Sequence, residues 1–243
     1  MRQWTVFIWL LCLAAVVGCE NRTVAVSNDE QTEQLLMETD TTQSLYVYYP
    51  LFTYIDLACG EMPRVSDPNV VMCLSAAFTG KETSLFSHNN IAGDHVASGV
   101  FHEGYRCPAN TGLFVYYDQR WQFIPSATSD SLTRAADEGG MGFAQIMLVY
   151  RGKPCQVQIG GRNRFRALCE KDGRLCIVES RSLQDIDSFV RCLLNYDVRH
   201  ALYLQPGEGW NYSWYRDAAG VAHEMHPKTH DYSTNWLTFY HLR

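Results

Sequence analysis

The sequence lacks the basic excess that is typical of proteins that bind nucleic acid. It has 20 Lys and Arg residues against 26 Asp and Glu residues, which gives a formal net charge of −6. A face that binds a phosphate backbone normally carries more positive than negative charge. Internal repeats, low-complexity runs and a second long apolar segment are also absent. We therefore expect no nucleic-acid partner, and a repeat architecture is excluded.

The Cys-x-x-Cys spacing of common zinc and redox motifs is absent too. Seven cysteines follow Cys19, and an odd number cannot all pair in disulfides. Most of them lie in apolar segments, where cysteine behaves as a small hydrophobic residue. The histidines His223, His226 and His230 invite a metal-site interpretation, but their spacing is not that of a metalloprotease helix and Pro227 would break such a helix. We therefore expect no metal and no cofactor.

The N-terminus has the features of a bacterial lipoprotein signal peptide. Arg2 precedes a short apolar stretch, and Val16-Val17-Gly18-Cys19 has the form of a lipobox, in which the cysteine is lipidated. This stretch is too short to span a bilayer. An ordinary cleaved secretory signal is the alternative, and both predict export. We expect a signal peptide over residues 1–19, and a lipid on Cys19 that holds the protein at the bacterial cell envelope, in the periplasm or on the outer-membrane surface.

Two further segments follow the signal peptide. Residues 20–43 are polar and rich in Thr, Glu, Asp and Asn, which is typical of a flexible tether. Residues 44–243 have the length of one domain with a full core. The sequence therefore predicts a single folded domain, linked by a tether to the membrane.

The apolar segments of this domain predict strands first and a strand–helix–strand unit later. The stretches SLYVYYPLFTYIDLAC and NVVMCLSAAF read as strands, and TGLFVYYDQRWQFI predicts a hairpin around Asp118-Gln119. A short helix is expected over residues 131–138 with Asp130 as its N-cap, followed by a strand in FAQIMLVYRGKP. The predicted fold class is α+β, with a mixed β-sheet, flanking helices and one βαβ crossover near the C-terminus.

The stretch RFRALCEKDGRLCIVES predicts a tight hairpin around Asp172-Gly173. Counting outward from this turn sets Cys169 opposite Cys176. Opposed residues of antiparallel strands have Cα atoms about 4.5–5.5 Å apart. We expect the two cysteines to be neighbours on one face, and free thiols are favoured over a disulfide.

A helix and a strand follow this hairpin. Ser182 is a candidate N-cap for a helix that ends near Asn195, with apolar residues at helical spacing, and the stretch HALYLQ then predicts a strand. A right-handed crossover would make this strand a parallel neighbour of the strand through Ile177. Ligands collect beyond the carboxyl ends of such strands. The turn Pro206-Gly207-Glu208-Gly209 would lie there.

The succession of these segments resembles the phosphodiester glycosidase family. The hairpin, the helix and the stretch ALYLQPGEGW are similar to that family's C-terminal half, in which a hairpin and a helix precede an A-L-N-L-D-G-G-G-S segment. Upstream, CLSAAFTG resembles the family's N-G-G-Y-F strand end, and QIMLVYRGKP resembles its P-x-L-V-x-N-G-K strand and turn. This chain has Gln205 where the family has aspartate, and Ser75-Ala76-Ala77 where the family has Asn-Gly-Gly.

The resemblance implies an envelope-anchored hydrolase that cleaves a glycosyl phosphodiester, with a glycan or sugar phosphate as its substrate. Such cleavage needs a carboxylate near an oxocarbenium-like centre and cations that hold the departing phosphate. The alternative is a catalytically inactive carbohydrate-binding or structural lipoprotein of the same fold, which the amide Gln205 favours. Whether the chain is an enzyme is therefore left open by the sequence.

The segment after the strand HALYLQ offers all the group types that this chemistry needs. Glu208 and Asp217 are carboxylates, Arg216 has a guanidinium that can bind phosphate through two N–H groups, and tryptophans flank the glycine turn. The alternative is a loop that packs its aromatic rings on the core and pairs Arg216 with Asp217 or solvent. We predict that this segment holds the sugar by stacking and the phosphate by charge.

A second group of polar residues lies in IAGDHVASGVFHEGYRC, where they alternate with glycines that let a backbone approach a ligand. A solvated surface hairpin is the alternative. Arg166 enters an apolar strand and needs a partner, either an anionic substrate or a structural ion pair. The predicted catalytic residues, expected in one cleft, are Glu208, Asp94, His95 and Arg166. The predicted substrate-binding residues are Trp210, Asn211, Trp214, Arg216, Asp217, Gln205, Glu103 and Arg106.

Overall fold

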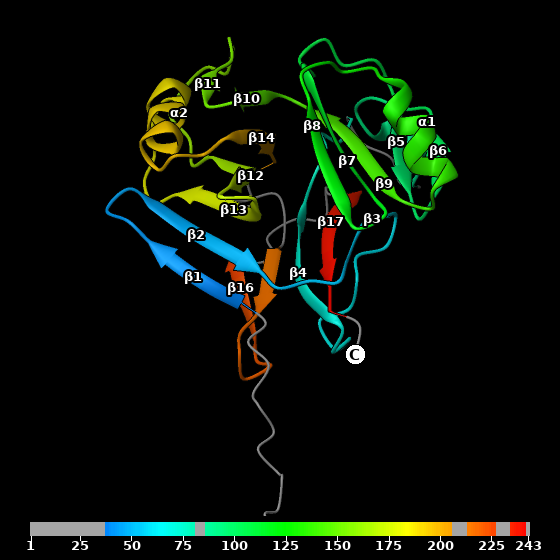
Figure 1. Cartoon of the computed structure of the whole chain (residues 1–243), viewed down its shortest axis with the longest axis horizontal. Coiled ribbons are helices and arrows are strands. Elements are labelled where there is room, and N and C mark those ends of the chain that lie inside the picture. The colour runs from blue at the N-terminus through cyan, green and yellow to red at the C-terminus, as the bar shows by residue number, and fades with distance from the viewer. Residues whose placement is uncertain (1–36, 81–85, 206–212, 227–233, 242–243) are drawn as a thin grey trace, which may run out of the picture. The chain divides into compact units, whose positions relative to one another are not determined.

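A computed structural model describes residues 37–80, 86–205, 213–226 and 234–241. The described strands form three sheets, in which every pairing between named strands is antiparallel (Figure 1). The predicted signal peptide, Cys19, Glu208, Trp210, Asn211 and His230 lie outside the described residues.

The first sheet has seven strands. In spatial order they are β1 (Met37–Thr41), β2 (Leu45–Pro50), β13 (Arg174–Ser180), β12 (Arg166–Lys171), β14 (His200–Leu204), β10 (Met147–Tyr150) and β11 (Lys153–Pro154). Strand β1 lies within residues 20–43, which the sequence predicts as a tether. In the structure residues 37–41 pair with β2 along the edge of the sheet.

The other two sheets have five strands each. The second sheet contains, in order, β16 (Ala222–His226), β15 (Ser213–Arg216), β4 (Val70–Ser75), β17 (Asn235–Tyr240) and β3 (Tyr54–Cys59). The third contains β6 (Val100–His102), β5 (His95–Ala97), β9 (Met141–Gln145), β7 (Gly112–Tyr117) and β8 (Arg120–Ile124).

Alternation along the strands gives the first sheet two buried faces. Leu168 and Ile177 pack in one core cluster with Leu237 of the second sheet and Phe143 of the third. Their chain neighbours point to the opposite face, where helix α2 (Ile186–Asn195) covers them with its apolar side. Helix α1 (Asp130–Asp137) covers the third sheet in the same way. Among the described residues, no helix has the length and apolar character needed to cross a membrane.

The predicted α+β fold with a mixed sheet is wrong. The strands are antiparallel and the two described α-helices have only eight and ten residues. Strands β13 and β14 do run in the same direction, but β12 lies between them and pairs antiparallel with both. They are therefore not parallel neighbours. The predicted strand SLYVYYPLFTYIDLAC is divided between β2 in the first sheet and β3 in the second.

The predicted hairpin of β12 and β13 is confirmed. Asp172 and Gly173 have φ values of 52° and 71°, the left-handed conformation that a two-residue type I′ turn requires. The register sets Cys169 opposite Cys176, and both are buried free thiols. Sequence counting from a tight turn therefore gives the correct pairing.

The helix N-caps lie at residues other than those predicted. Helix α1 is capped by Ser129 rather than Asp130, and α2 is capped by Asp185 rather than Ser182. The Asp185 carboxylate accepts from the backbone N–H of Ser188 at 2.7 Å and from its hydroxyl at 3.0 Å. These hydrogen bonds hold the pKa of Asp185 below its usual value.

We expect Asp185→Ala to lower Tm by about 2–4 °C at neutral pH, because α2 loses its cap. A depressed pKa in the folded state adds stability above the unfolded pKa, and this stability is lost as pH falls through the folded pKa. The Tm difference should therefore shrink in acid. Asp187→Ala removes an acidic residue from the same turn but leaves the cap, and serves as the control in thermal melts across pH. Equal shifts for the two variants would contradict the cap assignment.

Candidate active site

The three segments that resemble the phosphodiester glycosidase family meet in the structure. Ala76 follows β4 of the second sheet, and Gln205 follows β14 of the first. The backbone N–H of Gln205 donates to the Ala76 carbonyl at 3.4 Å, and Gln145 Nε2, at the end of β9, donates to the same oxygen at 3.3 Å. Next to it, the Asn235 side chain exchanges hydrogen bonds with both backbone groups of Ala77.

A buried ion pair lies on the two central strands beside this junction. Arg166 and Glu179 are directly opposed residues of β12 and β13. The Arg166 guanidinium is fully buried, contacts the Glu179 carboxylate through Nε and Nη2, and donates from Nη1 to Ser213 Oγ at 2.7 Å. Of the two partners that the sequence leaves open for Arg166, the structure shows the ion pair.

Two tyrosines near this ion pair stay protonated. Tyr48 lies on the same face of the sheet as the pair, and Tyr203 lies on the opposite face. Burial, followed by the Glu179 charge, raises the pKa of the half-buried Tyr48. Burial also raises the pKa of Tyr203, and the Arg166 charge offsets this only in part. The Tyr48 ring packs on Tyr215 with centroids 5.3 Å apart. We call Arg166, Glu179, Ser213, Tyr48 and Tyr215 the Arg166 cluster. It combines a cation, a carboxylate and hydroxyl groups.

Gln205 adds a free acceptor at the edge of this region. Its Oε1 is buried and has no hydrogen-bond partner among the described residues. A buried acceptor without a partner is costly, so it is a place where a ligand hydroxyl can bind. Gln205 is also the first residue after β14, directly before the segment that contains Glu208 and Trp210.

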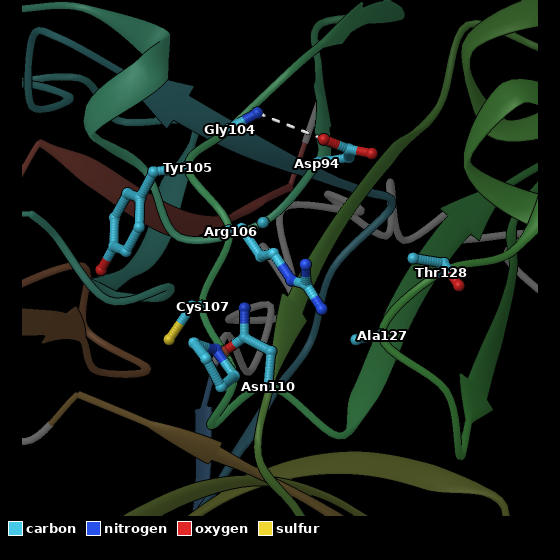
Figure 2. Close-up of a pocket in the computed structure, with 10 residues that line it drawn as sticks. Asp94, Gly104, Tyr105, Arg106, Cys107, Asn110, Ala127 and Thr128 are labelled. Carbon is cyan, nitrogen blue, oxygen red and sulfur yellow. Dashed lines mark hydrogen bonds between the residues drawn. The ribbon is translucent and has the colours of Figure 1, made fainter.

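Asp94 and Arg106 lie elsewhere, at a cavity of about 460 Å³ beside the third sheet. Figure 2 shows both side chains around this cavity together with Asn110 and Thr128. The Asp94 carboxylate accepts from the N–H of Gly104 at 3.3 Å. Asn110 is buried, and its Oδ1 has no partner among the described residues. Two residues of the second predicted group, Asp94 and Arg106, therefore line a cavity.

The remaining predicted residues of this second group do not line the cavity. His95 is fully buried and donates from Nδ1 to the Gly93 carbonyl at 3.2 Å. Glu103 is exposed and is not among the cavity-lining residues. No described contact joins Asp94 or His95 to Arg166. The described residues therefore form two groups in different sheets, where the sequence predicts one cleft.

The described part of the aromatic segment is mostly structural. Trp214 is fully buried among Val70, Cys73 and Trp236, so its ring packs on the core, as in the alternative interpretation. Among the described residues, Arg216 donates to the backbone carbonyls of Val65, Asp67, Val70 and Gly220.

Asp217 also has a local partner. It accepts from His223 Nε2 at 2.6 Å, and this hydrogen bond holds its pKa below the usual value. His223, in β16, is therefore paired with a carboxylate. We leave Trp214, Arg216 and Asp217 out of the proposed site.

The overall fold, with its three antiparallel sheets, is similar to that of a phosphodiester glycosidase catalytic domain. The structure is similar to the catalytic domain of zebrafish N-acetylglucosamine-1-phosphodiester alpha-N-acetylglucosaminidase, auto-inhibited by its pro-peptide. The TM-score is 0.56 over 86% of this chain and 82% of the zebrafish chain. The identity is 9%, so the likeness shows a distant relationship of fold. No protein-family model and no curated protein matches the sequence.

Proposed function

We propose that this chain is a hydrolase that cleaves a glycosyl phosphodiester, with its active site at the Arg166 cluster. The observation that carries the proposal is the fold likeness to a phosphodiester glycosidase catalytic domain over 86% of the chain. The Arg166 cluster is favoured over the Asp94 cavity because it lies beside the junction where the three family-like segments meet.

The groups of the cluster suit the chemistry. Breaking the bond between the anomeric carbon and the phosphate oxygen leaves positive charge on the sugar and negative charge on the departing phosphate. In the proposed site Glu179 faces the sugar and accepts a proton from the attacking water, while Arg166 pairs with the phosphate monoester as it leaves. The protonated hydroxyl of Tyr48 donates to the substrate. Glu208 and Trp210, shortly after Gln205 in the chain, are proposed as a further carboxylate and a sugar platform.

Binding of a phosphate at this site requires Arg166 to share its donors. In the structure its guanidinium already contacts Glu179 and Ser213, so an anion would compete with them for the N–H groups of the guanidinium. This commitment, and the amide Gln205 in place of an aspartate, favour a second candidate function: a carbohydrate-binding lipoprotein that keeps the fold without turnover. The two functions are separated by one assay.

The test is release of sugar from a chromogenic sugar phosphodiester by the full chain. We expect turnover by the wild type and a loss of at least about 100-fold in kcat for Glu179→Gln, which keeps size and hydrogen bonding but removes the charge. The matched control is Glu38→Gln, because Glu38 forms an exposed ion pair with Arg174 at 2.9 Å in the same sheet. Retention on a glycan column without turnover by the wild type would support the second function instead.

Membrane anchoring is proposed from the lipobox alone. We expect Cys19→Ala to release the protein from the membrane fraction, or to leave the precursor uncleaved, because the lipid is attached to that thiol. Fractionation of cells that express either form provides the measurement. Identical membrane partition of the variant and the wild type would contradict lipidation at Cys19.

A further inference from the structure

Three side chains with metal-binding atoms converge between the second and third sheets, away from the Arg166 cluster. Cys59 ends β3, His88 begins the short 3-10 helix η1 (His88–Asn90), and His95 begins β5. One ligand atom from each lies within 4.8 Å of the other two. We propose that Cys59, His88 and His95 form a zinc site, a role that goes beyond the proposed hydrolase function.

A tetrahedral ion would require the three ligand atoms, which lie within 4.8 Å of one another, to move to a more even spacing. His88 Nδ1 and His95 Nε2 are 2.9 Å apart. Zinc binds nitrogen at about 2.0–2.1 Å and sulfur at about 2.3 Å, which sets ligand atoms roughly 3.3–3.6 Å apart around a tetrahedron. The two nitrogens therefore need to separate by a few tenths of an ångström to admit the ion. One thiolate and two imidazoles form a donor set that suits zinc better than magnesium or calcium.

The surroundings of His95 orient it as a ligand. Its Nδ1 donates to the Gly93 carbonyl, so in the neutral ring Nε2 carries the lone pair, and Nε2 is the atom that faces His88 Nδ1. A metal-binding histidine typically donates its other ring N–H to a carbonyl or carboxylate in this way. The ring is also fully buried.

The other two side chains are positioned by packing. The His88 ring stacks on His102, with ring centroids 3.4 Å apart and an interplanar angle of 3°, and Phe86 meets it edge-on. Strand pairing sets His102 directly opposite His95. Zinc binds cysteine as the thiolate, so binding would release the Cys59 thiol proton.

This site could not be predicted from the sequence because its three residues do not form a motif. Cys59, His88 and His95 are spread over three elements, and they do not follow a Cys-x-x-Cys or His-x-x-x-His spacing. Three protein ligands leave one tetrahedral position for water or another small ligand, as in other open zinc sites.

The experiment is zinc and cobalt titration of the metal-stripped full chain. We expect one zinc ion per chain by calorimetry, and with cobalt a tetrahedral visible spectrum with a thiolate charge-transfer band. Cys59→Ser should remove that band and weaken zinc binding roughly 100-fold or more. Cys192→Ser, which alters a partly buried free thiol on α2, should leave both unchanged.

A second variant covers the case in which Cys59→Ser does not fold. His88→Gln should weaken zinc binding to a similar extent while it keeps the thiolate band at high cobalt concentration. Absence of a one-to-one zinc complex in the wild type would overturn the proposal. Equal zinc affinity of the wild type and both ligand variants would overturn it as well.

Discussion

Arg166→Ala is expected to lower the free energy of unfolding by about 3–5 kcal/mol. The Arg166 side chain is completely buried and the Glu179 side chain is 10% exposed, so the variant would leave a buried carboxylate without its cation. Removing one partner of a buried pair is far more costly than removing both, because the remaining charge loses its compensation. Urea denaturation of the purified domain measures the difference.

The chain offers a matched control for this prediction. Arg174 forms an ion pair with Glu38, and the two side chains are 45% and 41% exposed. Arg174→Ala should cost less than about 1 kcal/mol, because water screens and replaces an exposed pair. The double variant Arg166→Met with Glu179→Leu should regain most of the stability that Arg166→Ala loses. A stability of Arg166→Ala equal to that of the wild type would show that the ion pair does not form.

Gly104→Ala is expected to destabilise the fold by about 3 kcal/mol. A Cβ at this position would lie 2.0 Å from the Gly93 carbonyl oxygen and 2.4 Å from that of Ile91. These are backbone atoms held by the bridge between Ala92 and Tyr105, so they cannot move aside as a flexible side chain would. The same change would displace the wall of the Asp94 cavity, to which Gly104 contributes.

Gly160→Ala is the control, because a Cβ there meets no atom within 4 Å and the residue does not have a positive φ. It should leave stability unchanged or raise it slightly, since alanine restricts the unfolded chain. Thermal and urea unfolding of both variants test the pair. Similar stabilities for the two would contradict the close packing of segments 91–93 and 104–105.

Local chemistry made part of the fold predictable from the sequence. The Asp172-Gly173 turn fixes the register of β12 and β13, and the count that pairs Cys169 with Cys176 also sets Arg166 opposite Glu179. The pair Arg166 and Glu179 lies three residues further from the turn than the two cysteines, so the same count predicts it.

Pairing between distant segments could not be predicted in the same way. Alternation of apolar residues shows that a strand is buried, but it does not show which strand lies beside it. The return of β14 beside β12 instead of β13 is therefore not encoded in any local pattern. Two of the carbonyl partners of Arg216, Val65 and Val70, could not be predicted for the same reason, since they are about 150 residues away in the chain.

The Ala76 carbonyl has a consequence for how this fold can diverge. One oxygen accepts from Gln205 after β14 and from Gln145 at the end of β9, while Ala76 itself follows β4, so it joins the ends of strands from all three sheets. Two of the three groups are backbone atoms, which every amino acid other than proline supplies in full. Side chains at positions 76 and 205 can therefore change through evolution without breaking this connection. The main-chain part of this connection does not depend on side-chain identity. It can therefore be kept between chains of similar fold that share as little as 9% identity.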